Sequence, residues 1–165
     1  MHMYAPLTQL SLGIHAVTPP AFFVFLCMLF VSVLLYTKRK REAAIFSVAF
    51  IATVLIVTIL KYTFAVQRPE AALITLTDYA FPSSHAAFSA FLATMLGWLD
   101  VHTRQYSRIH AYFFFGFFYV LALMVALSRL VIGVHTPFQI TVGFLLGVLI
   151  PLVVIYGARR VYPTI

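Results

Sequence analysis

Five apolar runs, each about as long as a membrane-spanning helix, limit this chain more than any other feature of its sequence. They cover residues 20–37, 43–60, 81–99, 111–127 and 138–158. A helix needs about 20 apolar residues to cross a bilayer, with a range of roughly 17 to 25. Only 9% of the residues are charged, whereas soluble domains carry roughly a quarter. The sequence therefore predicts an all-α, polytopic membrane helical bundle with about five transmembrane helices.

The remaining composition excludes several other classes of protein. A hydrophobic content of 63% does not fit intrinsic disorder. The single cysteine, Cys27, excludes a disulfide scaffold and a cysteine-based zinc site. Residues 4–18 are too short and too polar to span, so we expect a short interfacial segment there, with His15 at the interface. We expect residues 1–165 to form one integral membrane domain.

Lysine and arginine in the short loops predict the orientation of the bundle. Four basic residues at 38–41 follow the first run, Arg104 and Arg108 follow the third, and Arg159 and Arg160 follow the fifth. With five spans these residues share one side, which the positive-inside rule assigns to the cytoplasm. We therefore expect a protein of the cell or inner membrane whose N-terminus lies outside. A nucleic-acid partner is rejected, because these cations do not form a soluble basic face.

Three basic residues remain on the outer side, where the positive-inside rule does not explain them: Lys61, Arg68 and Arg129. Three cations around one spot suit a multiply charged anion such as phosphate or diphosphate. His85 and His135 lie on the same side. Two histidines beside an anion suit phosphoryl transfer, one as the nucleophile and one as the general acid.

The start of the third run adds a second kind of anion ligand. Ser83 and Ser84 stand where a helix begins, and the free backbone N–H groups of a helix N-terminus bind anions. The sequence has no carboxylate cluster that would hold magnesium at this place. We therefore expect no metal and no cofactor, with the cationic side chains neutralising the transition state.

Three short motifs in this region resemble those of the type 2 phosphatidic acid phosphatase (PAP2) superfamily. Residues 61–69 match its K-x6-R-P motif, residues 82–85 match P-S-x-H, and residues 128–135 match S-R-x5-H. The resemblance implies a helical bundle that hydrolyses phosphate or diphosphate esters without a metal ion.

The resemblance also implies the roles of individual residues. The phosphate oxygens would be bound by Lys61, Arg68, Arg129, Ser83 and nearby backbone N–H groups. Ser84, which stands where the family usually has glycine, is a further candidate donor. His135 would attack phosphorus and form a phosphohistidine, and His85 would protonate the leaving group. Ser128 would support the site from beside Arg129.

The chain departs from the family pattern in three places. Ser84 stands where glycine is usual, five spans replace the usual six, and Gln139 replaces an aspartate four residues after the nucleophilic histidine. Residues at i and i+4 share a helix face, so Gln139 can orient His135 but supplies no charge. Two acids lie on the outer side, Glu70 and Asp78. We expect Asp78 to be the better candidate for the missing carboxylate.

The substrate predicted from the sequence is a polyprenyl diphosphate. Residues 135–139 resemble the H-T-x-x-Q ending of dolichyl and related polyprenyl diphosphate phosphatases. Phosphatidylglycerol phosphate, phosphatidate and lipid A are alternatives within the same chemistry, and a lipid phosphotransferase has the same motifs. A non-catalytic lipid-diphosphate binder is a further alternative because of Gln139. A small transporter is disfavoured, because transport sites usually lie near the middle of the membrane.

Overall fold

All regular secondary structure in the described residues, 5–103 and 108–161 of the computed structural model, is helical. Six helices follow one another in this part of the chain: α1 (Ala5–Val17), α2 (Pro20–Tyr36), α3 (Lys40–Phe64), α4 (Ser84–Thr103), α5 (Arg108–Val131) and α6 (Pro137–Val161). The predicted all-α class is therefore confirmed.

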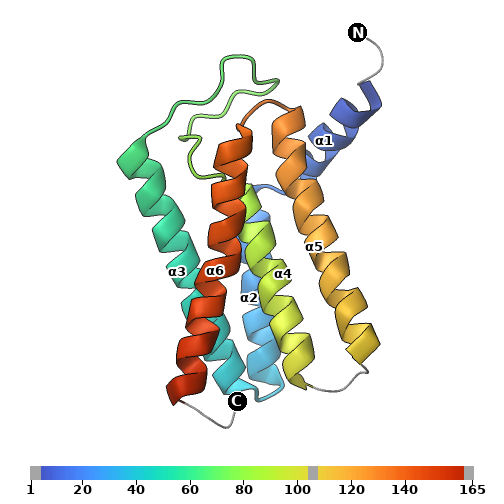
Figure 1. Cartoon of the computed structure of the whole chain (residues 1–165), viewed down its shortest axis with the longest axis vertical. Coiled ribbons are helices and arrows are strands. Elements are labelled where there is room, and N and C mark those ends of the chain that lie inside the picture. Colours follow the sequence, from blue (N-terminus) through green and yellow to red (C-terminus); the bar gives the residue numbers. More distant parts are fainter. Residues whose placement is uncertain (1–4, 104–107, 162–165) are drawn as a thin grey trace.

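The five helices α2 to α6 lie alongside one another as a bundle, and helices consecutive in sequence run in opposite directions (Figure 1). The loop of residues 65–83 joins α3 to α4 at one end of this bundle, and a short turn joins α5 to α6 at the same end. The helix α1 also lies at this end, beside α5. We refer to it below as the site end.

The number of helices able to cross a membrane is smaller than the sequence predicts. By length and hydropathy, α3, α5 and α6 qualify among the described residues, and α1 with α2 would form a fourth span if the bent pair crosses together. Five spans are therefore not confirmed. The helix α2 has only 17 residues, and α4 carries polar side chains such as His85, Ser89 and Thr94.

The central position of α4 explains its polar composition. This helix contacts α2, α3, α5 and α6, and most of its side chains are buried. A helix enclosed by four others does not face lipid, so its polar side chains need partners inside the protein rather than an apolar solvent. Thr94, for example, bonds the hydroxyl of Tyr119 on α5 at 2.7 Å.

Two glycines bring α6 against α4. A Cβ atom on Gly143 would lie 2.4 Å from the carbonyl oxygen of Ser83, and one on Gly147 would lie 2.1 Å from that of Ala87. Real Cβ atoms do not approach a backbone oxygen this closely, so only glycine allows this helix separation. The G-x-x-x-G pattern of α6 thus serves packing within the bundle.

A proline pair separates α1 from α2. Pro19 disfavours a helical conformation at Thr18, and Pro20 is the first residue of α2. The two helices meet at 54°, which directs α1 away from the α2 axis and against α5. The expected segment of residues 4–18 is thus a helix from Ala5, while Tyr4 and the predicted cytoplasmic Arg104 lie outside the described residues.

Candidate active site

A cavity of about 340 Å³ lies at the site end of the bundle, among α1, α2, α3, α4 and the loop of residues 65–83. Its polar wall contains six of the residues singled out by the sequence: Lys61, Arg68, Asp78, Ser84, His85 and His135. Ser83, Ser128, Arg129 and Gln139 are buried and do not line it. The three motifs, although up to 74 positions apart (135 − 61), therefore converge on one place.

Asp78 holds two of the three cations. Its Oδ2 pairs with Lys61 Nζ at 2.8 Å and its Oδ1 with Arg68 Nη2 at 2.6 Å. Burial opposes ionisation of this carboxyl group, but the hydrogen bonds from Lys61 and Arg68 outweigh it and lower the pKa of Asp78. In the described part of the chain both carboxylate oxygens of Asp78 bond the cations and neither bonds His135, so the structure gives no support to Asp78 as the missing carboxylate partner. The carboxylate orients the cations instead.

His135 has a defined tautomer in this site. Its Nε2 lies 3.2 Å from Arg68 Nη1 and its Nδ1 lies 3.3 Å from Gln139 Oε1. A guanidinium only donates hydrogen bonds, so Nε2 must carry a lone pair. The ring proton then lies on Nδ1 and points at Gln139. The nitrogen that is free to attack a phosphorus atom is therefore Nε2, beside the cations.

The side chain of Gln139 cannot be turned over without losing a bond. The backbone N–H of Thr136 donates to Gln139 Oε1 at 3.0 Å. A backbone N–H requires an acceptor, so the amide oxygen, not its NH₂ group, must lie here and face His135. Glutamine thus takes over the orienting function that an aspartate would have, without its negative charge.

The surroundings of His135 favour the neutral ring. Burial comes first and the nearby Arg68 cation second, and together they lower the pKa of His135 to about 4 against a smaller opposing effect of Gln139. His135 lies in the turn between α5 and α6 and is only 4% exposed. With this pKa, Nε2 of His135 is unprotonated over the whole physiological pH range.

His85 faces Thr18, the residue that directly follows α1. Its Nε2 lies 2.9 Å from the carbonyl oxygen of Thr18, and the edge of its ring packs against Phe23 with centroids 6.0 Å apart. A carbonyl oxygen only accepts, so Nε2 carries the proton and donates it in this bond. The histidine assigned as the general acid therefore already presents an N–H to an oxygen atom.

Arg129 is a fully buried cation. Its Nε and Nη2 each donate to Ser128 Oγ at 3.2 Å, and its Nη1 donates to His15 Nδ1 at 2.9 Å. No carboxylate pairs with Arg129 among the residues that the structure describes. A buried charge without a counter-ion is costly, which fits a site whose counter-ion is the substrate.

The serines start α4 at the wall of the cavity. Ser83 precedes the first helical residue, and its Oγ accepts from the N–H of Ala86 at 3.5 Å in the manner of an N-cap. Its own N–H donates to the carbonyl oxygen of Gln139 at 3.2 Å. Ser84 lines the cavity itself. The helix N-terminus expected from P-S-S-H is therefore present at the anion site.

Sequence reasoning missed two groups of this site. His15 was expected at the interface, yet it lines the cavity and bonds Arg129. The carbonyl of Thr18, which accepts from His85, is a backbone atom and leaves no trace in a sequence pattern. The only local signal was the polar composition of residues 4–18.

Comparisons with known proteins agree with these findings. The profile of the PAP2 superfamily matches residues 42–162, whereas no curated protein matches. The solved PAP2-type phosphatidylglycerolphosphate phosphatase from Bacillus subtilis superposes with a TM-score of 0.82 at 22% identity, over 93% of this chain and 77% of that one. LpxE from Aquifex aeolicus superposes with a TM-score of 0.57 at 23% identity, over 90% and 93%. Together with the three converging motifs, the profile match shows that this chain belongs to the PAP2 superfamily of membrane phosphatases.

Proposed function

We propose that this protein hydrolyses the phosphate or diphosphate group of a membrane lipid through a phosphohistidine on His135. One observation carries the proposal: the lone pair of His135 Nε2 lies against the guanidinium of Arg68, while Gln139 holds the proton on Nδ1. A neutral imidazole whose free nitrogen faces bound cations is arranged to attack an anion that those cations hold.

In the first step Lys61, Arg68 and Arg129 bind the phosphoryl oxygens, together with the start of α4 at Ser83 and Ser84. His135 Nε2 forms a bond to phosphorus as the bond between phosphorus and the leaving oxygen breaks. His85 gives its proton to that oxygen. In the second step His85 takes a proton from water, whose oxygen attacks phosphorus as the bond between phosphorus and His135 Nε2 breaks, which releases inorganic phosphate and free His135. The cations stabilise the charge on the phosphoryl oxygens in both transition states.

The donor set supports catalysis by cations rather than by a metal. The site has three cationic side chains and one carboxylate, and both oxygens of that carboxylate are bonded by Lys61 and Arg68. Magnesium is normally held by free carboxylates and substrate phosphates. We therefore propose that the reaction needs no metal ion.

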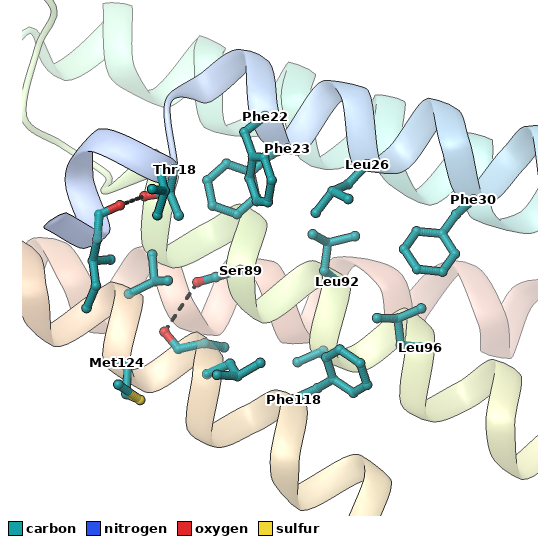
Figure 2. Close-up of a pocket in the computed structure, with 16 residues that line it drawn as sticks. Thr18, Phe22, Phe23, Leu26, Phe30, Ser89, Leu92, Leu96, Phe118 and Met124 are labelled. Carbon is teal, nitrogen blue, oxygen red and sulfur yellow. Dashed lines mark hydrogen bonds between the residues drawn. The ribbon is translucent and has the colours of Figure 1, made fainter.

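An apolar groove next to His85 supports a lipid substrate. The groove has a volume of about 410 Å³ and lies among α1, α2, α4 and α5. Figure 2 shows Phe22, Leu26 and Phe30 on one side of it and Phe118 and Met124 on the other. Its inner end reaches Thr18 and Phe23, both of which contact His85. A leaving group that receives its proton from His85 would place its hydrocarbon chain in this groove.

Our first choice of substrate is a polyprenyl diphosphate, on the basis of the H-T-x-x-Q ending at residues 135–139. Phosphatidylglycerol phosphate is the second candidate, because the fold matches a phosphatase of that lipid. Phosphatidate and lipid A follow. The site would face the extracytoplasmic side, since basic residues gather at the opposite end of the bundle, at 38–41 and at Arg159 and Arg160.

The test is phosphate release by the purified protein in detergent, with undecaprenyl diphosphate, phosphatidylglycerol phosphate and phosphatidate as separate substrates and EDTA present. We expect EDTA-resistant release that His135→Ala abolishes and that His85→Ala strongly lowers, because His85 would donate a proton in the first step and accept one in the second. The exposed His110, at the other end of the bundle, gives the matched control His110→Ala with wild-type activity.

The other outcomes separate the alternatives. Tight binding of all three lipids without phosphate release would contradict the proposal and indicate a lipid-diphosphate binder. Loss of substrate without free phosphate, but with a newly phosphorylated lipid, would indicate a phosphotransferase.

A further inference from the structure

The helix α1 contributes a third histidine to the site. His15 lines the same cavity as His85 and His135, and its ring centroid lies 6.3 Å from that of His85. Its Nδ1 accepts a hydrogen bond from Arg129 Nη1, so this nitrogen is unprotonated. His15 lies outside residues 42–162, the part matched by the PAP2 profile. No role for it follows from the family motifs.

The position of His15 is fixed by its neighbours. The hydroxyl of Thr18 donates to the carbonyl oxygen of Ile14 at 2.7 Å. The backbone carbonyl oxygen of Thr18 accepts from His85 Nε2 at 2.9 Å. Ser11, one turn before His15, is only 2% exposed, and α1 packs against α5. His15 is thereby held on the side of His85, the residue that would protonate the leaving group.

Burial first, and the nearby cations Arg129 and Arg68 second, lower the pKa of His15 and favour its neutral ring while the site is empty. It faces Arg129 on α5, Arg68 from the loop of residues 65–83 and His85 on α4, and it shares the cavity with Lys61 and Asp78. In this state His15 Nδ1 occupies one donor of Arg129. A bound anion that takes over this donor also adds negative charge beside the imidazole, and a protonated His15 then becomes favourable.

We infer that His15 binds the inner phosphoryl group of a lipid diphosphate and makes the enzyme selective for diphosphates over monophosphates. This inference rests on the proposed function. In a diphosphate His135 bonds to the terminal phosphorus, the bond from that phosphorus to the bridging oxygen breaks, and His85 gives its proton to the departing phosphate. That phosphate lies next to His85, within reach of His15. A monophosphate ester has only an alcohol oxygen there.

The experiment compares farnesyl diphosphate with farnesyl monophosphate, which share one hydrocarbon chain. We expect His15→Ala to lower kcat/KM for the diphosphate about 10- to 100-fold, the usual effect of losing a hydrogen bond to a charged group, and to change the monophosphate value less than about threefold. His15→Gln can still accept from Arg129 but cannot become a cation, so it should keep the fold and recover only part of the loss. His110→Ala is the matched histidine control.

The pH dependence of KM separates phosphate binding by His15 from a merely structural role of this residue. If His15 gains a proton on binding, KM for the diphosphate rises with pH more steeply than KM for the monophosphate, and His15→Gln removes the difference. Equal losses on both substrates in both variants would overturn the inference. Hydrolysis of the monophosphate alone by the wild type would overturn it too, while leaving the phosphatase function intact. Failure to hydrolyse either ester or the other candidate lipids would overturn both proposals.

Discussion

At the scale of single residues, the site depends on which nitrogen of His135 carries the proton. Gln139 Oε1 receives both the Thr136 N–H and the His135 Nδ1–H, so one side chain determines the tautomer. In a serine protease, replacing the comparable aspartate by asparagine produces the wrong tautomer and costs about 10⁴ in turnover. Here a backbone donor orients the amide, so we expect the correct tautomer of His135 to be kept.

Gln139→Leu is therefore expected to lower kcat by about 10² to 10⁴, because the ring loses the acceptor that holds its Nδ1 proton. Gln139→Glu is the matched variant: it keeps an acceptor of the same length and adds a negative charge beside the ring, which should raise the pKa of His135. Steady-state phosphate release over pH 4 to 8 measures both effects. Equal activity of the leucine variant and the wild type would contradict the orienting role.

The pKa of His135 itself predicts a second result. Burial and the Arg68 cation lower this pKa from 6.5 to about 4. The unfolded chain therefore binds the proton more readily than the folded one, and the contribution of His135 to stability is lost as pH falls from about 6.5 to about 4, by roughly 3 kcal/mol. Histidine ¹⁵N NMR should find Nε2 unprotonated down to about pH 4. Titration of His135 near its ordinary value of 6.5 would contradict the described environment.

At the scale of helices, the contact between α4 and α6 positions the proposed phosphate site. Ser83 starts α4 and donates its N–H to the carbonyl of Gln139 on α6, directly where Gly143 allows the two backbones to meet. The separation of these helices thus sets the distance between the start of α4 and the turn that carries His135. A substitution that changes the packing of α4 against α6 should therefore change the activity.

Gly143→Ala and Gly147→Ala are expected to destabilise the protein by about 1–3 kcal/mol each, the usual cost of forcing an extra methyl group into a packed interior. Gly143→Ala should also lower activity, because its Cβ would displace Ser83. Gly157→Ala on the same helix is the matched control, since a Cβ there meets nothing within 4 Å. Thermal unfolding in detergent measures the stabilities. A Tm of Gly143→Ala equal to that of Gly157→Ala would contradict the close contact.

At the scale of the whole molecule, charge is divided between the two ends of the bundle. The catalytic candidates lie at the site end, and the basic residues at 38–41, 159 and 160 lie at the other (Figure 1). Under the positive-inside rule, this division of basic residues supports the proposal that the site faces the extracytoplasmic side. The orientation depends on more than one loop, because no single loop contains both the site residues and the basic residues of the opposite end.

Single cysteines at the two ends test this orientation. In a background with Cys27→Ala, we expect Glu70→Cys to react with an impermeant maleimide added to intact cells. Lys40→Cys should react only after the membrane is opened. Both positions are exposed, so accessibility differs only through the membrane. The reverse labelling pattern would place the site in the cytoplasm.

The sequence by itself determined the helical class, the three motifs and most of the residues that meet in the cavity. These features are local: hydropathy periods, short spacings and residue types with specific chemistry. The same local information predicted five spans, a number that the structure does not confirm. It did not separate the central α4, whose polar side chains are satisfied by other helices, from a helix that faces lipid.

Only the tertiary structure decided how the site residues are partnered. Asp78 pairs with Lys61 and Arg68 rather than with His135, and the Thr136 N–H orients the oxygen of Gln139. His15 reaches Arg129 across 114 positions of sequence. Each of these results depends on the direction of a side chain, on a backbone atom or on a contact between distant segments. Such contacts are set by how helices pack in three dimensions, which residue patterns along one helix do not contain.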